Sequence, residues 1–260
     1  MTAAEVESVD RVLWRARAAA FPPQEFVGQE SFVGAGEVLE IARRAGVGPG
    51  VRLLDVCCGV AGPGLHVAGA LDCAYLGVDA SRRSVDRARE RAAAAGTAAR
   101  FEVATVPPLP VGPFDVVLLL ETMLAFRDRP ALLRAVAGAL PLGGRFAFSV
   151  EEGVPLTAIE RQAMPASDSV WLSTLPRLRA DLDRAGLRVT WCAETSRAHR
   201  VRVDALVDAY AAAAPALVAA GAGDTVEDLL AAHRLWRRWL GNGRVRTFAV
   251  VAEKVRADEG

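Results

Sequence analysis

An acid closes an apolar run near residue 55, and a bend of small residues follows it at once. The run 51–56 contains Asp55 and is predicted to be a buried strand. Gly59, Gly62 and Gly64 lie in the bend, and the segment 65–71 has the composition of a helix. A strand, a tight bend and a helix in this order bring the backbone close to a ligand and point the helix N-terminus at it. The stretch therefore favours an open α/β sheet with a ligand site after its first strand.

A second acid follows about twenty residues later, as expected for a nucleoside site. The apolar run 73–78 reads as the next strand and ends in Asp79. At this position a carboxylate accepts hydrogen bonds from ribose hydroxyls. The alternative role for Asp79 is that of a helix-capping acid, but Ser81 already supplies a cap for the helix predicted over 82–95. The two acids together predict a nucleoside cofactor.

The spacing of the glycines indicates which cofactor. A dinucleotide fingerprint reads G-x-G-x-x-G, whereas this chain has Gly59-x-x-Gly62-x-Gly64 after Asp55. That arrangement resembles motif I of the class I S-adenosylmethionine-dependent methyltransferases, with Cys57 and Ala61 where the family usually has glycine. The resemblance implies that S-adenosylmethionine is the cofactor. It also implies that its methionine end is held by Asp55, Cys57, Gly59 and Gly62, and its ribose by Asp79 and Ala80.

The rest of the chain alternates between strand and helix patterns, which is typical of a doubly wound sheet. Further strands are predicted over 100–104, 114–120, 145–150, 187–194 and 245–254. Further helices are predicted over 5–20, 36–45, 130–140 and 173–185. An insert at 197–242 is predicted to hold two more, at 203–220 and 225–240.

This layout resembles the seven-stranded Rossmann-like methyltransferase sheet, in which the last strand is antiparallel and lies beside the sixth. We therefore expect a single domain over 1–260, with a cofactor-binding core at 51–196 and the last strand at 243–256. The N-terminal helices (1–46) and the insert (197–242) resemble the helical lid and cap of small-molecule methyltransferases.

The same resemblance implies further cofactor contacts at the next two strand ends. Thr105 and Val106 follow the third strand, where backbone groups are expected to meet the adenine. Glu121 follows the fourth strand, where the sulfonium end of the cofactor meets the substrate, although it also reads as an acid at a helix start. The Asn-Pro-Pro-Tyr motif of base-modifying enzymes is absent from this position.

The residues that bind the methyl acceptor are marked by fewer sequence motifs than the cofactor site. Glu151 follows the fifth strand at the edge where doubly wound folds place their sites, and His199 and His233 lie in the insert. These are the candidate catalytic bases, although a surface or packing role is the favoured reading for each histidine. Phe26, Gln29, Phe32 and Met123 are the candidate lid and substrate residues, and the alternative for the segment 26–32 is a connector with two buried aromatic rings.

The amino-acid composition restricts the binding partners and the cellular location that we expect for the protein. The chain has 31 basic and 31 acidic residues and no basic run, so nucleic acid is not an expected partner. No apolar run approaches the ~20 residues of a membrane span. The four cysteines lack metal-ligand spacing, so we expect no metal and a cytoplasmic protein with reduced thiols. A homodimer is left open.

The function expected from these features is methyl transfer to a small organic acceptor, such as a bacterial secondary metabolite, with oxygen as the first candidate atom and nitrogen or carbon next. Two alternatives stay open. One is a fold member that keeps S-adenosylmethionine while catalysing cyclisation or rearrangement without methyl transfer. The other is a noncatalytic partner subunit that has lost cofactor binding, although such a chain would be expected to have lost both Asp55 and Asp79.

Overall fold

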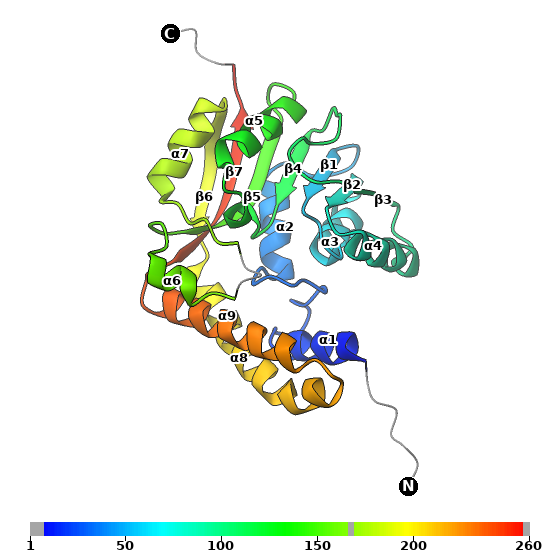
Figure 1. Cartoon of the computed structure of the whole chain (residues 1–260). Coiled ribbons are helices and arrows are strands. Elements are labelled where there is room, and N and C mark those ends of the chain that lie inside the picture. Colours follow the sequence, from blue (N-terminus) through cyan, green and yellow to red (C-terminus); the bar gives the residue numbers. More distant parts are fainter. Residues whose placement is uncertain (1–7, 166–168, 257–260) are drawn as a thin grey trace.

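The computed structural model describes residues 8–165 and 169–256, and within them seven strands pair into one sheet in the order β3-β2-β1-β4-β5-β7-β6 (Figure 1). β7 is antiparallel to both of its neighbours, and every other pairing is parallel. The chain order reverses between β1 and β4, the position where doubly wound folds bind ligands. The strand bounds are β1 (Arg52–Val56), β2 (Ala74–Asp79), β3 (Ala99–Val103), β4 (Val116–Leu119), β5 (Arg145–Glu152), β6 (Leu187–Glu194) and β7 (Arg246–Lys254).

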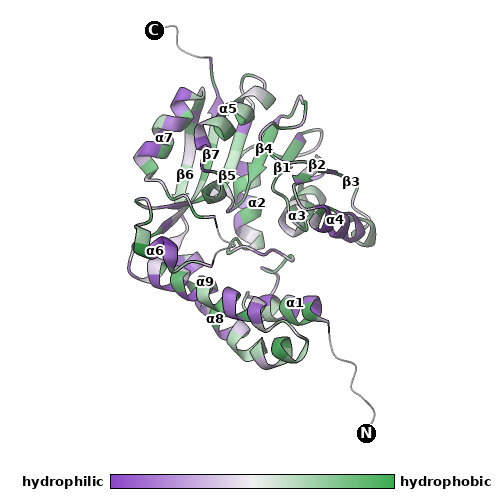
Figure 2. Ribbon diagram, in the orientation of Figure 1, coloured by the Kyte–Doolittle hydropathy of each residue, from purple (hydrophilic) through white to green (hydrophobic). Residues whose placement is uncertain are grey.

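Helices cover both faces of this sheet, so its central strands are largely buried and mostly apolar, and β4 is apolar at every position. Leu53 and Leu54 are adjacent on β1 and enter opposite clusters of the core. One face packs on α2 (Ala35–Arg44), α3 (Gly62–Leu71) and α4 (Arg82–Ala95). The other packs on α5 (Arg129–Ala139) and α7 (Leu175–Arg184). Figure 2 shows the polar residues of α4 and α7 on their outer sides and the hydrophobic strands between the layers.

A separate group of helices lies beyond the carboxyl ends of the parallel strands (Figure 1). It consists of α1 (Val9–Ala19), α8 (Ser196–Ala219) and α9 (Gly223–Gly241). These helices share a third apolar cluster that includes Leu13, Tyr210 and Trp239. We call α1, α8 and α9 the cap helices. None of the helices within the described ranges has the length and apolar character of a bilayer span.

The predicted doubly wound sheet with an antiparallel last strand is confirmed. Some predicted boundaries differ. α3 begins at Gly62 and not at residue 65, because Pro63 fits the first turn of a helix, where its missing N–H costs nothing. α8 begins at Ser196 and not at 203, so His199 is a helical residue. The short helices η1 (Met123–Ala125) and α6 (Ala158–Gln162) were not predicted, and residues 5–7 of the first predicted helix lie outside the described residues.

Candidate active site

Asp55, on β1, is a nearly completely buried carboxylate. It is 4% exposed, and its Oδ2 accepts a hydrogen bond of 2.6 Å from the hydroxyl of Tyr75 on β2. Burial raises the pKa of Asp55 to about 7, although the Tyr75 hydrogen bond opposes the shift. The sequence analysis missed Tyr75. The available signal was a tyrosine in an otherwise apolar strand, because a buried hydroxyl needs a partner.

The bend after β1 is held by alternating left-handed residues. Cys57, Gly59 and Ala61 have φ values of 59°, 53° and 57°. Two of these positions carry a side chain at a conformation that favours glycine, which accounts for the glycines usual in this motif. The Gly59 N–H donates to Asp79 Oδ2 (2.9 Å), so Asp79 fastens the bend to the end of β2. Asp79 Oδ1 accepts from the Ser81 N–H (2.8 Å), and the Ser81 hydroxyl caps α4 as predicted.

The first turn of α3 lies directly against neighbouring groups. A Cβ on Gly62 would overlap the carbonyl of Val27, and a Cβ on Gly64 would overlap the Asp55 carboxylate and the Tyr75 hydroxyl. Glycine is therefore needed at both positions for close approach. This packing holds the helix N-terminus against the buried acid.

A cavity of about 240 Å³ opens over this bend. Its walls include the carboxylates Glu30, Asp55 and Glu121, but no arginine or lysine is among the described residues that line it. Such a site favours a cation and disfavours a pyrophosphate. S-adenosylmethionine fits these residues, since its ammonium and sulfonium groups are cationic and Asp55 is a buried acid without a counterion in the described part of the chain. Predicted cofactor residues in the wall are Asp55, Cys57, Gly59, Gly62 and Glu121, and the lid candidate Gln29 also lines it.

The remaining predicted cofactor residues lie outside this cavity, along the same edge of the sheet. The Ala104 N–H donates to the Asp79 carbonyl (3.0 Å), which joins the ends of β2 and β3. Ala80 and Thr105 are exposed and Val106 is half-buried just beyond these ends. They stay predictions for the adenosine half of the cofactor.

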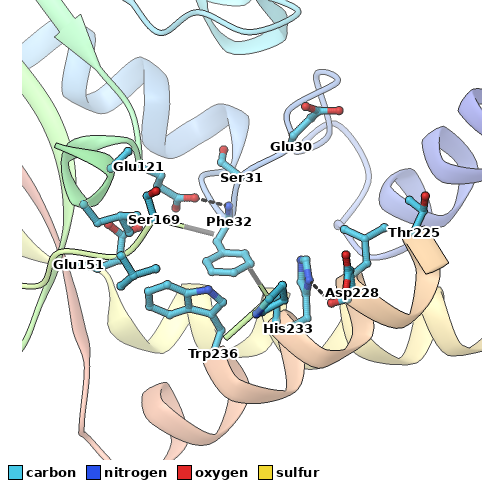
Figure 3. A pocket seen from close by; sticks show the side chains of 16 residues that line it. Glu30, Ser31, Phe32, Glu121, Glu151, Ser169, Thr225, Asp228, His233 and Trp236 are labelled. Atoms are coloured by element: carbon cyan, nitrogen blue, oxygen red, sulfur yellow. Dashed lines mark hydrogen bonds between the residues drawn. The ribbon is translucent and has the colours of Figure 1, made fainter. Parts of the chain in front are cut away.

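A larger cavity of about 760 Å³ adjoins the first (Figure 3). Glu30, Ser31 and Glu121 line both cavities, so the two share a wall. Glu151, Phe32 and His233, all singled out from the sequence, line the larger one. Its walls come from the segment 30–32, the ends of β4 and β5, and α9, which places it between the sheet and the cap helices.

Glu121 lies where the two cavities meet. Its Oε2 accepts from the Phe32 N–H (2.6 Å), and its own N–H donates to the Ser149 hydroxyl (2.7 Å). Its φ of 48° is unfavourable for a residue with a side chain, and strain of this kind concentrates at functional sites. Burial raises the pKa of Glu121 well above its usual value, and the nearby charge of Glu151 adds to the shift.

His199 reaches Glu121 but lines neither cavity. The side chain is fully buried on α8, with Nδ1 3.2 Å from Glu121 Oε1 and Nε2 2.9 Å from Glu37 Oε1. Arg202 donates to the same Glu37 carboxylate (2.8 Å). The prediction that His199 acts directly on a substrate therefore needs correction, because the ring is enclosed by acids on both sides. Glu37 was not singled out, since an acid in the first turn of a helix gives no specific signal.

Glu151 and His233 are differently placed. Glu151 is 4% exposed, its Oε2 has no hydrogen-bond partner among the described residues, and burial raises its pKa to about 7. His233 Nδ1 is 2.7 Å from the Leu229 carbonyl and therefore donates to it, and burial lowers the pKa of His233. The ring lies edge-on to Phe32, with centroids 5.8 Å apart.

Three of the candidate lid and substrate residues make contacts that stabilise the fold. Gln29 is 2% exposed and braces its own loop by donating to the Glu25 and Val33 carbonyls. Phe26 packs on Trp14, with centroids 4.8 Å apart, and lines neither of the two cavities. Met123 was expected beside the substrate, but it is fully buried in the core cluster on the α5 face because η1 turns it inward.

Two of the glycines of α3, Gly64 and Gly69, provide a matched test of the packing against Asp55. We expect Gly64→Ala to lower the free energy of unfolding by ~1–3 kcal/mol, because the added methyl displaces the Asp55–Tyr75 pair. Gly69→Ala is the control, since its Cβ would meet nothing within 4 Å, and it should be neutral or stabilising by ~0.5–1 kcal/mol. Urea unfolding measures both, and equal effects would contradict the close approach.

The raised pKa of Asp55 predicts proton release on cofactor binding. At pH 6 the buried carboxyl is mostly protonated, and an ammonium placed beside it would lower its pKa. Affinity for S-adenosylhomocysteine should therefore rise as the pH increases from about 6 to above 7. Titration calorimetry at pH 6 in buffers of different ionisation enthalpy should detect the released proton, and Asp55→Asn should abolish the release. Identical heats in all buffers for the unaltered protein would refute it.

Comparison with known proteins finds methyltransferases. A methyltransferase domain model matches residues 53–144, which span β1 to the start of β5. The 27-O-demethylrifamycin SV methyltransferase of Amycolatopsis mediterranei is 36% identical over 157 residues, which are 56% of this chain and 58% of that protein. Phosphoethanolamine N-methyltransferase 1 of Arabidopsis thaliana is 34% identical over 112 residues, 42% of this chain and 23% of that protein. The chain thus spans less than two thirds of these relatives.

Among solved structures, the [4+2]-cyclase SpnF superposes with a TM-score of 0.75 at 19% identity, covering 95% of this chain and 93% of that one. The sheet order, the acid-led bend of motif I and the matched domain lead to one conclusion. Residues 53–144 of this chain form a methyltransferase domain of the class I S-adenosylmethionine-dependent type.

Proposed function

We propose that this protein transfers the methyl group of S-adenosylmethionine to a small organic acceptor, with a hydroxyl oxygen as the methylated atom. The observation that carries the proposal is the pair of acid-lined cavities that meet at Glu121. The smaller lies over the motif I bend, and the larger has room for an acceptor. When bound, S-adenosylmethionine supplies an electrophilic methyl group on its sulfonium sulfur.

The relatives support a small acceptor. One is named for an O-methylation of a rifamycin and another for an N-methylation of phosphoethanolamine. A bacterial secondary metabolite fits the cavity of about 760 Å³ between the sheet and the cap helices. Transfer to nitrogen is the next alternative, followed by transfer to carbon.

Methylation of a hydroxyl releases a proton, and Glu121 is the best-placed residue to take it. Three titratable residues line the larger cavity as candidates for this role, namely Glu121, Glu151 and His233. Of these three, Glu121 alone also lines the smaller cavity. Burial raises the pKa of Glu121, which makes its carboxylate a stronger proton acceptor. His199 and Glu37, behind it, would act as positioning residues, with His199 Nδ1 beside Glu121 Oε1 and His199 Nε2 beside Glu37 Oε1. Glu151 and His233 remain candidates that line only the larger cavity.

We propose further that the chain works as one domain. The N-terminal part (1–46) and the insert (197–242) would together enclose the site over the core (51–196), with the last strand (243–256) completing the sheet. The packing of α1 on α8 supports this organisation, as does the Arg17–Tyr210 hydrogen bond of 3.1 Å between them. Enclosure would exclude water from the transfer. We also propose a cytoplasmic location and a homodimer.

One alternative keeps the fold and cofactor but not the transfer. The [4+2]-cyclase SpnF resembles this chain in fold, at 19% identity. Product mass separates the two reactions, because transfer adds one methyl group and releases S-adenosylhomocysteine, whereas cyclisation does neither. The buried base at the shared wall favours transfer, since a cycloaddition releases no proton.

The direct test supplies S-adenosylmethionine with a deuterated methyl group and a panel of hydroxylated macrolactones, amino alcohols and phosphoethanolamine. We expect labelled product together with S-adenosylhomocysteine. A failure of the protein to bind S-adenosylmethionine in calorimetry would contradict the proposal, and so would label found only in RNA or protein.

For the accepted substrate, Glu121→Gln should lower kcat by about 10²–10⁴, the range of general base catalysis, while S-adenosylhomocysteine affinity changes little. His199→Asn should have a smaller effect on kcat and shift its pH profile, as expected of a positioning residue. Glu90→Gln, on the exposed side of α4, is the control for the loss of one negative charge. An unchanged kcat in Glu121→Gln would remove Glu121 from the reaction.

A further inference from the structure

We propose that the acceptor carries an ammonium group, and that Glu151 binds this cation in the larger cavity beside the rings of Phe32 and Trp236. The inference rests on the proposed function and specifies its substrate class. An amine-bearing metabolite would be seated by its charge, and its hydroxyl would then be presented to the shared wall at Glu121.

The first support is the charge of the cavity. Four carboxylates line it, and neither arginine nor lysine is among its described lining residues, although the chain contains 31 basic residues. The four acids come from separate parts of the fold, namely the segment before α2, the ends of β4 and β5, and α9. They are Glu30, Glu121, Glu151 and Asp228.

The second support is Glu151 itself. This residue is 4% exposed, and its Oε2 finds no hydrogen-bond donor among the described residues. The next residue, Glu152, has a donor for each carboxylate oxygen. Its Oε2 accepts from Arg246 (3.1 Å), and its Oε1 accepts from the Leu175 N–H (3.3 Å). A buried acceptor without a partner is costly, so its persistence at a cavity wall indicates that a ligand supplies the missing donor.

The third support is the aromatic wall. Phe32 and Trp236 line the cavity, with their ring centroids 6.3 Å apart and their planes at 70°. Figure 3 shows these rings between Glu121 and Glu151 on one side and Asp228 on the other. Aromatic faces attract cations, and they do so more strongly where water is excluded. Carboxylates combined with aromatic rings are suited to an ammonium group.

The same walls disfavour a phosphorylated acceptor. A phosphate is bound by arginine, lysine or a helix N-terminus, and the described lining of the larger cavity offers neither of the two side chains. Four acids would repel it. The inference thus separates this chain from relatives named for phosphoethanolamine, while keeping a positively charged acceptor.

The test uses two probes of the same shape that differ in charge. These are benzyl(2-hydroxyethyl)ammonium, which carries two N–H donors, and its carbon isostere 4-phenylbutan-1-ol. The measurement is made at neutral pH, where the amine is protonated. Binding of each is measured by calorimetry on the full chain already saturated with S-adenosylhomocysteine. We expect the cation to bind about tenfold more tightly or better, as for a charge-assisted contact.

Single substitutions show which residues cause the preference for the cationic probe. Glu151→Gln keeps the shape of the side chain and should remove most of the preference for the cation, while the affinity for the neutral probe is kept. Asp228→Asn is an exposed substitution that should lower the preference by a smaller factor even if Glu151→Gln fails to fold. Glu90→Gln, outside the cavity, should leave the preference unchanged.

Each result has one meaning. Equal binding of the two probes, or a preference that survives in both cavity variants, overturns the ammonium site and leaves the proposed methyl transfer standing. A protein that does not bind S-adenosylhomocysteine overturns the proposed function, and the acceptor site falls with it. Tighter binding of the neutral probe would show that the acids act in their protonated form on an uncharged acceptor.

Discussion

The site depends on a buried carboxylate that has no counterion among the residues that the structure describes. Asp55 is held by Tyr75 and enclosed by the first turn of α3. Burying a carboxylate carries a large desolvation penalty, which appears here as a raised pKa. The surrounding residues must be small for this arrangement to close, which explains glycine at position 64 and the small residues of the bend. An ammonium group in the adjoining cavity would satisfy the charge that the protein leaves unpaired.

Buried acids also lie at or just beyond the ends of two other strands, at the carboxyl edge of the sheet. Glu121 after β4 and Glu151 at the end of β5 are both buried, and both have a raised pKa. Three neighbouring strands thus each present an acid to one enclosed space. A low dielectric strengthens every interaction of these acids with a cationic ligand. The cap helices complete the enclosure, and their own apolar cluster keeps them together without the sheet.

The sequence predicts the sheet well because strand periodicity and the motif I bend are local signals. Asp55, Asp79 and the glycine spacing are read from a dozen neighbouring residues, and the parallel layout follows from alternation. The network of Glu121, His199 and Glu37 could not be predicted, because it joins residues up to 162 positions apart on β4, α8 and α2. The burial of Met123 could not be predicted for a related reason, since a single turn of η1 decides whether its side chain faces the substrate or the core. Pocket walls built from α9 and a loop carry no periodic signal at all.

The central claim is that the acid after the bend receives the ammonium end of the adenosyl ligand. A crystal structure of the protein with S-adenosylhomocysteine tests it most directly. The account predicts the ligand amino group about 3 Å from the Asp55 carboxylate, directly or through one water, and the ribose hydroxyls on Asp79. A ligand bound with its amino-acid end away from Asp55, or a smaller cavity left empty at saturating ligand, would contradict it.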